Sequence, residues 1–177
     1  MKILCLGDTH IPERAAEIPE WIMKLLVEER PDRILFTGDA TDPSVIYLLE
    51  RVAPVYAVRG NMDRFELPRE ISLELDGIKL LLMHGDRFGR GGYQEMARYA
   101  KQKGHDFVVC GHTHRQETFK TEGVVVVNPG SATGAWGGGR AGAPATPSVS
   151  IINTENREVV LYSGGIENGI QSKRFQG

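Results

Sequence analysis

The chain has 177 residues, of which 41% are hydrophobic and 25% charged, a composition typical of a globular protein with one domain. Its formal net charge of −2 provides no basic surface for a nucleic-acid backbone, so nucleic acid is not favoured as a partner. No apolar run approaches the ~20 residues of a membrane span, and the first residues lack the features of a signal peptide, so we expect a cytoplasmic protein without membrane contact.

Short apolar runs alternate with helical patterns along the N-terminal part of the chain. Continuous apolar runs predict buried strands, and apolar residues three and four positions apart predict helices. We expect strands at residues 2–6, 33–37 and 55–58, and helices that begin near Pro19 and at Asp42-Pro43, with Asp42 as the N-cap. This order predicts a parallel sheet with right-handed crossovers.

Hairpins and one helix follow. Two strands at 71–75 and 78–83, joined by the Asp76-Gly77 turn, predict a hairpin, and a helix over 93–103 ends at Gly104. The apolar run 107–110 leads into Gly111-His112-Thr113-His114. We expect further antiparallel strands at 116–120, 124–127, 149–152 and 159–162.

The remaining segments have no regular pattern. Residues 134–147 are rich in Gly, Ala and Pro and predict a loop, either a plain connector or a border of the site. One domain accounts for residues 1–163, and the polar tail at 164–177 is expected to be poorly ordered. Cys5 and Cys110 lie in apolar runs and are interpreted as buried core residues in a reducing compartment.

Side chains that can bind metals stand directly after five of the predicted strands. Sites in open α/β sheets form at the carboxyl ends of strands, so we expect these side chains to meet. Four of the five histidines of the chain are among them. The predicted ligands are Asp8, His10, Asp39, Asn61, His84, His112 and His114.

This ligand set has a consistent chemistry. Imidazole, carboxylate and amide ligands without a thiolate suit borderline divalent ions and argue against a purely structural zinc. Seven ligands are too many for one ion and suit two, with Asp39 as the shared carboxylate. Two ions ~3.5–4 Å apart clamp a phosphoryl group and lower the pKa of a bridging water. We expect two divalent ions, Mn²⁺ first, with Fe, Zn, Ni or Co as alternatives.

These motifs resemble, in order and spacing, those of the calcineurin-like metallophosphoesterases: Asp8-x-His10, Gly38-Asp39, Gly60-Asn61, His84 and Gly111-His112-x-His114. The resemblance is closest to the small single-domain branch with YfcE-type phosphodiesterases and the Vps29 retromer subunit, whose closing motif is similar to Asn128-Pro129-Gly130-Ser131. It implies an α/β fold, a two-sheet β-sandwich flanked by helices. It also implies a first metal bound by Asp8, His10, Asp39 and His114, and a second bound by Asp39, Asn61, His84 and His112.

Two positions depart from the family pattern. Many relatives have a histidine that protonates the leaving group or steadies the phosphate at the position of Met62. Loss of a general acid typically forfeits about 10²–10⁴-fold in rate, so we expect better turnover of activated esters. Asp86 stands where relatives often have histidine, and it either repels an anionic substrate or orients a ligand histidine.

Other polar residues near the motifs have weaker claims. Arg59 is a candidate phosphate contact, with a surface ion pair as the alternative. Arg87 is a weaker candidate for the same contact. Asp63 either hydrogen-bonds a ligand histidine or forms a turn. His105 is interpreted as structural, and Trp136 either lines a substrate cleft or is an isolated exposed aromatic residue.

The predicted function is that of a metal-dependent phosphoesterase, more specifically a phosphodiesterase. A hydroxide bridging two divalent cations would attack a small phosphate ester, with Asp39, Asn61 and Arg59 in the catalytic machinery. The alternatives are a protein-interaction scaffold on the same fold, like Vps29, or a weakly active metal-binding sensor. The sequence leaves the oligomeric state open; small relatives often associate, so a homo-oligomer rests on family analogy alone.

Overall fold

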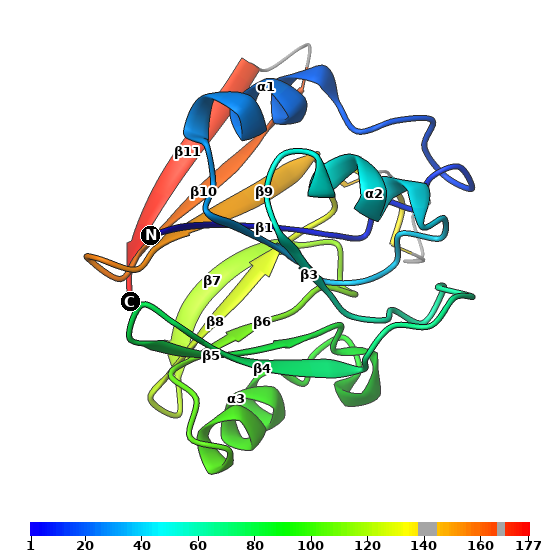
Figure 1. The fold of residues 1–177 in the computed structure, drawn as a ribbon. Helices are drawn as coiled ribbons and strands as arrows, with labels where there is room; N and C mark the ends of the chain where they lie inside the picture. Colours follow the sequence, from blue (N-terminus) through cyan, green and yellow to red (C-terminus); the bar gives the residue numbers. More distant parts are fainter. Residues whose placement is uncertain (138–144, 166–168) are drawn as a thin grey trace.

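The computed structural model describes residues 1–137, 145–165 and 169–177. Its strands form two sheets, with α1 and α2 on one side of the molecule and α3 on the other (Figure 1). The elements are β1 (Lys2–Leu6), α1 (Glu20–Glu29), β2 (Arg33–Phe36), α2 (Ser44–Glu50), β3 (Val55–Ala57), β4 (Glu70–Leu75), β5 (Ile78–Met83), the 3₁₀ turn η1 (Asp86–Phe88), α3 (Tyr93–Gln102), β6 (Phe107–Val109), β7 (Gln116–Thr121), β8 (Val124–Pro129), β9 (Ser148–Asn153), β10 (Glu158–Gly165) and β11 (Gly169–Gln176).

The six-stranded sheet has the order β11-β10-β9-β1-β2-β3. Strands β1, β2 and β3 are parallel, with Leu4 opposite Ile34 and Leu35 opposite Tyr56, which confirms the predicted parallel core. Strand β9 joins β1 in antiparallel fashion. The C-terminal strands therefore extend the sheet on the side away from β2.

The five-stranded sheet has the order β4-β5-β6-β8-β7. The predicted hairpin is β4–β5, with Leu75 opposite Ile78 at its turn. Strands β5, β6 and β8 are parallel, and β7 pairs antiparallel to β8. The strands that precede the predicted ligands are thus divided between the two sheets, a division that strand order along the chain does not reveal.

Both faces of the central strands are buried, which explains why their sequences are apolar without alternation. Leu4 and Leu6 of β1 pack in the cluster under α1 and α2, whereas Cys5 points into the cluster between the two sheets. Cys110 lies with Ala97 in the cluster that α3 covers. Both cysteines are free and buried, as predicted. The chain is therefore a sandwich of two sheets flanked by helices, which confirms the expected fold.

The expectation of a poorly ordered C-terminal tail is wrong. Strand β10 continues to Gly165, and β11 pairs with it along its whole length, from Phe175 opposite Val159 to Gly169 opposite Gly165. Phe175 packs against the core between the sheets. The other side chains of β11 are exposed, so this edge strand is ordered by backbone pairing and one anchor and has no amphipathic pattern.

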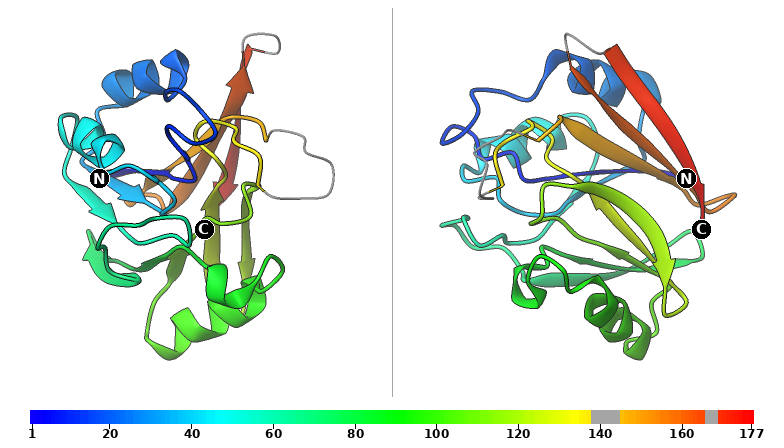
Figure 2. Two further views of the ribbon diagram at one scale, coloured as in Figure 1. Left: turned by 90° about the vertical axis from the view of Figure 1, so that its right-hand side faces the viewer. Right: turned by 180° about the vertical axis from the view of Figure 1, so that it is seen from behind.

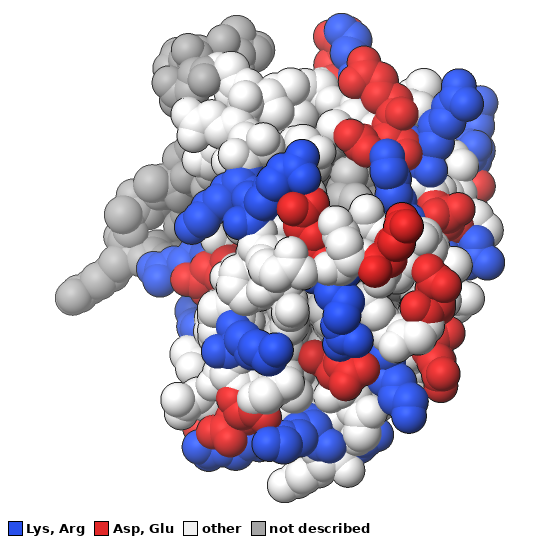
Figure 3. Space-filling view, turned by 90° about the vertical axis from the view of Figure 1, so that its left-hand side faces the viewer, with Lys and Arg blue, Asp and Glu red and all other residues white. Residues whose placement is uncertain are grey.

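The predicted loop in the glycine-rich stretch, the absence of a membrane span and the surface charge can be compared with the structure. Residues 134–137 and 145–147 of the glycine-rich stretch form neither helix nor strand, as predicted, while residues 138–144 lie outside the described part of the chain. None of the helices in the described part of the chain combines the length and the apolar character that a membrane span needs. On the side that carries both termini, acidic and basic side chains are interspersed without a continuous basic stripe (Figure 3).

Candidate metal centre

The predicted ligands come together at one end of the sandwich. Loops that follow β1, β2 and β3 of one sheet meet loops that follow β5 and β6 of the other (Figure 2, left). The loops are fastened to one another, because Asp8 N–H donates to Gly38 O at 2.9 Å and Gly111 N–H donates to His84 O at 3.0 Å. Position at a strand end therefore translates into proximity, as the sequence indicated.

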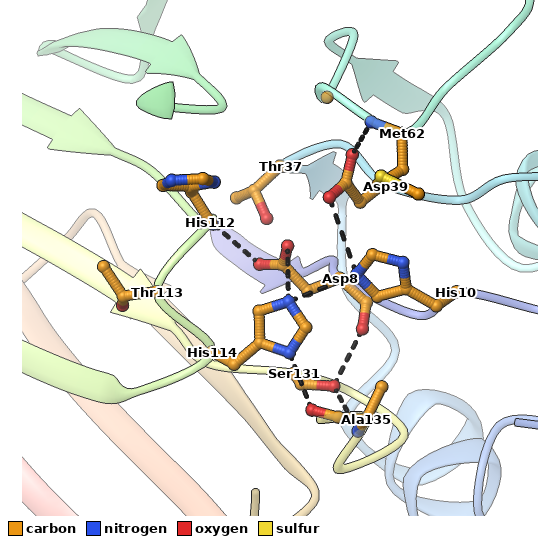
Figure 4. Close-up of polar contacts among 12 residues, drawn as sticks. Asp8, His10, Thr37, Asp39, Met62, His112, Thr113, His114, Ser131 and Ala135 are labelled. Atoms are coloured by element: carbon orange, nitrogen blue, oxygen red, sulfur yellow. Dashed lines mark hydrogen bonds and ion pairs between the residues drawn. The ribbon is translucent and has the colours of Figure 1, made fainter. Parts of the chain in front are cut away.

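The first half of the site is buried and contains Asp8, His10 and His114. The two histidines present Nε2 to each other at 3.1 Å, and His114 Nε2 lies 3.4 Å from Asp8 Oδ1. Figure 4 shows both rings beside the Asp8 and Asp39 carboxylates. Three potential ligand atoms thus converge on one point.

The second half opens toward solvent. Asn61 is exposed, and its Oδ1 lies 3.0 Å from both His84 Nε2 and His112 Nδ1. Asp39 stands between the halves, with Oδ2 3.5 Å from His10 Nε2 and 3.5 Å from His84 Nε2. This is the position expected of a shared carboxylate. Which ion each residue binds stays a prediction.

The hydrogen bonds of the histidines direct their lone pairs into the cluster. His84 Nδ1 donates to Thr37 O at 2.8 Å and His114 Nδ1 donates to Ala135 O at 2.7 Å, so Nε2 of each neutral ring is an acceptor. Among the described residues, buried Asp8 Oδ1 has no hydrogen-bond donor. Acceptors that face one another in a buried site require a proton or a cation between them. The nitrogen and oxygen set fits borderline divalent ions.

The charges of the cluster shift the pKa values of its members in opposite directions. Burial alone lowers the pKa of His84, but the hydrogen bond to Asp39 and the charges of Asp8 and Asp39 outweigh it and raise the pKa to about 9. Burial raises the pKa of Asp39, but the hydrogen bond and the charge of His84 outweigh burial, so the pKa is lowered overall. Burial dominates for His10, whose pKa is lowered. The acidic charges around His84 therefore favour a positive charge at this point of the cluster.

The close approach of the loops depends on two glycines. A Cβ atom on Gly60 would lie 2.0 Å from Asp39 Oδ1, and one on Gly111 would lie 2.6 Å from Asp8 Oδ2. Neither position has room for a side chain without moving a carboxylate. The glycines in the motifs are thus required by packing against the ligands.

A polar network, for whose members no role was predicted from the sequence, holds the loop that carries His112 and His114. Buried Asn128 donates to Gly111 O at 2.9 Å and to Thr113 Oγ1 at 3.0 Å, and Thr113 also bonds the Tyr93 hydroxyl at 3.0 Å. Ser131 Oγ donates to Asp8 O at 2.7 Å. The closing motif therefore fixes backbone on both sides of the cluster, and its sequence signal was polar side chains at the end of an apolar strand.

Two aspartates outside the ligand set, Asp63 and Asp42, have structural contacts. Asp63 accepts from Asp39 N at 2.9 Å, Gly60 N at 2.8 Å and Thr41 N at 2.9 Å, so it forms the turn. Among the described residues its hydrogen bonds include none to a histidine. Asp42 accepts from Ser44 N at 2.8 Å, but the N-cap of α2 is Pro43, so the predicted N-cap is one residue too early and Asp42 bonds the first helical N–H from the position before Pro43.

The remaining candidate site residues, Arg87, His105 and Arg59, differ in their contacts. Arg87 pairs with Glu70 at 2.8 Å, and His105 bonds Ala100 O at 3.3 Å, so both have structural partners. Arg59 directly precedes Gly60, and its backbone N–H donates to Pro68 O. No hydrogen bond joins its side chain to the ligands in the described part of the chain, and its contact with phosphate stays a prediction.

Comparisons with known proteins show the family of the chain. The family model of the calcineurin-like phosphoesterase superfamily domain matches residues 1–157. A protein of Methanothermobacter thermautotrophicus named "Probable metallophosphoesterase" is 39% identical over 136 residues, which cover 75% of this chain and 78% of that protein. Vps29 of Entamoeba histolytica complexed with Zn²⁺ is 29% identical, with a TM-score of 0.86 over 99% of each chain. Vps29 of Chaetomium thermophilum is 26% identical, with a TM-score of 0.89 over 99% of this chain and 97% of its own. The chain belongs to the calcineurin-like phosphoesterase superfamily.

Proposed function

We propose that the protein is a metal-dependent phosphodiesterase. The observation that carries this proposal is the cluster of acceptor atoms, in which Asp39 Oδ2 lies 3.5 Å from both His10 and His84 and Asn61 Oδ1 lies 3.0 Å from both His84 and His112. Two divalent cations bound there would stabilise charge on phosphate oxygens and lower the pKa of a water molecule.

The residues of the chain supply positioning. Asp39 Oδ1 accepts the Met62 N–H at 2.8 Å, so one carboxylate oxygen is fixed by the backbone while the other is directed at the histidines. Asn61 and His112 form the solvent-open side, where an ester can approach. We propose that Arg59 contacts the phosphate there, because a guanidinium matches phosphate geometry.

Met62 determines which esters suit the site. A thioether has no proton to give to a leaving group, and loss of a general acid costs about 10²–10⁴-fold in rate. Esters with acidic leaving groups need no such proton. The substrate we expect is therefore a small phosphodiester with a good leaving group.

Metal analysis combined with hydrolysis of bis-p-nitrophenyl phosphate, with and without Mn²⁺, tests the proposal. We expect about two ions per chain and turnover that depends on the ion. Parallel assays with Fe²⁺, Zn²⁺, Ni²⁺ and Co²⁺ rank the metals, with Mn²⁺ expected first. Purified protein that binds no metal and gives no Mn²⁺-dependent turnover would refute the enzyme.

A scaffold is the second candidate, favoured by the TM-score of 0.89 to Vps29. Metal binding does not separate the two candidates, because a Vps29 has been solved with Zn²⁺. Hydrolysis does: a scaffold binds metal without turnover. Convergence of the ligand set supports the enzyme, because protein contact does not require buried acceptors to face one another. Cytoplasmic location and self-association stay predictions.

A further inference from the structure

A cavity opens between the two sheets, and none of the predicted metal ligands lines it. Its volume is about 410 Å³, and its walls are residues 116–119 of β7, 161 and 163 of β10, and 171–173 of β11. Strand β7 is an edge of one sheet and β11 is an edge of the other (Figure 1). The interior of the sandwich is therefore reached from this side through a space within the range of small-molecule sites, about 300–1,000 Å³.

The protein itself sets the spacing of the cavity walls at one end. Gln116 of β7 donates from Nε2 to Val149 O at 2.8 Å and to Tyr162 O at 3.0 Å. These hydrogen bonds cross from one sheet to the other and join β7 to β9 and β10. The cavity is thus part of the fold.

The wall formed by β7 presents a hydroxyl to the interior. Side chains alternate between the two faces of a strand. Phe119 packs in the cluster that α3 covers, whereas Thr118 lies opposite Val127, which packs between the sheets. Burial raises the pKa of Tyr93 on α3, and the Glu117 carboxylate raises it further, which places Glu117 on the side of Phe119. Thr118 therefore faces the cavity, and the Glu117 charge lies on the other side of the sheet.

The opposite wall presents an amine, an amide and a hydroxyl. Phe175 of β11 packs between the sheets, so Lys173 and Gln171, two and four residues before it, take the same face. In the ladder Lys173 lies opposite Leu161, which packs in the same cluster, and Gln171 lies opposite Ser163. These four side chains therefore belong to the inward face of their strands.

The positive charge of this wall is not used by the fold. Within the described part of the chain Lys173 forms no ion pair, whereas its neighbour Arg174 pairs with Glu158 at 2.8 Å. An ammonium group beside a cavity without a carboxylate on its inward faces attracts an anion.

Two buried hydroxyl groups at the cavity also have no hydrogen-bond partner among the described residues. One is Thr118 Oγ1 in the wall, and the other is Ser150 Oγ on β9, which lies opposite Leu161 in the ladder. Nearly all buried polar groups in native proteins are hydrogen-bonded, so each of these calls for a partner. A hydroxyl both donates and accepts, and a ligand with hydroxyl groups can do the same.

We propose that this cavity is a binding site for a small sugar phosphate, separate from the metal centre. Lys173 provides the positive charge for the phosphate group. Thr118, Ser163 and Gln171 provide hydroxyl and amide groups that match the hydroxyls of a sugar. Leu161 provides an apolar surface for the carbon atoms of the sugar ring.

The same lining disfavours a nucleotide. Stacking of a base requires an exposed aromatic face. Phe119 is the aromatic residue of the described lining, and it packs in the cluster that α3 covers. The ligand class is therefore a phosphorylated sugar without a base.

Titration of the full chain, supplemented with Zn²⁺, with the phosphonate analogue of glucose 6-phosphate tests the site by amide NMR spectroscopy. The C–P bond of this probe prevents hydrolysis. We expect saturable shifts of the amide signals of residues 116–118 and 171–173. Glucose and methylphosphonate, added separately, should bind there at least about tenfold more weakly, because each makes only part of the contacts.

Two variants separate binding from stability. Lys173→Gln should weaken binding of the probe by about tenfold, and Lys101→Gln, which removes an exposed lysine of α3, should leave it unchanged. Thr118→Val keeps the shape of the side chain and should weaken binding by about fivefold. Because Thr118 Oγ1 has no partner in the fold, this variant should unfold in urea at no lower concentration than the parent.

Several results would overturn the site. Shifts confined to residues 111–114 would place the probe at the metal centre instead. Absence of saturable shifts, or equal affinity for methylphosphonate and the probe, would exclude a sugar phosphate. Equal effects of Lys173→Gln and Lys101→Gln would remove Lys173 from the site, and a loss of stability in Thr118→Val would show that its hydroxyl serves the fold.

Discussion

Replacement of Asn128 tests whether the network under the histidine loop sets the geometry of the metal site. The Asn128 side chain is fully buried, and its amide donates to Gly111 O at 2.9 Å and Thr113 Oγ1 at 3.0 Å. Its oxygen accepts the Gly130 N–H at 2.9 Å. These bonds attach the loop that carries both histidines of the motif to β8.

The expected loss follows from the partners left behind. A neutral hydrogen bond contributes about 0.5–1.5 kcal/mol, and a buried group left without a partner costs about 1–3 kcal/mol. Asn128→Ala strands the Gly111 carbonyl and the Gly130 N–H, so the free energy of unfolding should fall by about 3 kcal/mol. Metal affinity should fall as well, because His112 and His114 lose their fixed separation.

Urea unfolding with EDTA gives the first quantity, and competition with a chelator for Mn²⁺ gives the second. Asn156→Ala is a matched control: this exposed asparagine accepts one turn hydrogen bond, from Glu158 N at 3.1 Å. Its substitution should stay within about 0.5 kcal/mol of the parent. If Asn128→Ala behaved like this control in both measurements, the role we assign to the network would be wrong.

Asp39→Asn should abolish nearly all Mn²⁺-dependent hydrolysis and lower the metal content. Asp42→Asn, which keeps an acceptor for Ser44 N, should leave both unchanged. Wild-type rates in the first variant would exclude the bridging role. Gly60→Ala should lose metal binding because its Cβ would lie 2.0 Å from Asp39 Oδ1, while Gly91→Ala, with nothing within 4 Å, should bind metal normally. Burial alone raises the pKa of Glu70, but hydrogen bonds from a lysine, a tyrosine and an arginine outweigh it and lower the pKa overall. The ion cluster of Glu70 therefore stabilises the fold fully at pH values above the ordinary pKa of 4.5, and this stabilisation is lost as the pH falls below it. Glu70→Gln should therefore cost about 1 kcal/mol at pH 7 in urea unfolding, and a difference that persisted in acid would contradict this account.

Much of the site was predictable because position along a strand determines where a side chain lies. Asp8, Asp39 and His84 each follow an apolar run, and parallel strands deliver such residues to one edge. Asp63 could not be assigned in this way. Its carboxylate bonds three backbone N–H groups on two loops, and such contacts depend on loop conformation, which spacing does not encode.

The C-terminal strand escaped prediction for a different reason. Apolar alternation indicates strands that bury one face, but β11 lies at the edge of its sheet with nearly every side chain exposed. Its order comes from backbone pairing with β10, a long-range contact to which side-chain pattern contributes little beyond Phe175. Composition alone therefore indicated a tail.

The backbone conformation of the candidate metal ligands explains why neighbouring residues form so many hydrogen bonds to the backbone of these loops. Five predicted ligands have left-handed φ angles between 47° and 69°: Asp8, His10, Asp39, His112 and His114. A residue other than glycine pays about 1–3 kcal/mol for such a conformation, and surrounding structure has to offset the cost. Three hydrogen bonds hold these turns in place: Asp39 N donates to Asp63, Ser131 Oγ donates to Asp8 O, and the Asn128 amide donates to Gly111 O. The strained turns are thus set by the fold, which makes the candidate ligand atoms face one another, and such preorganisation by surrounding structure is what a metal site needs.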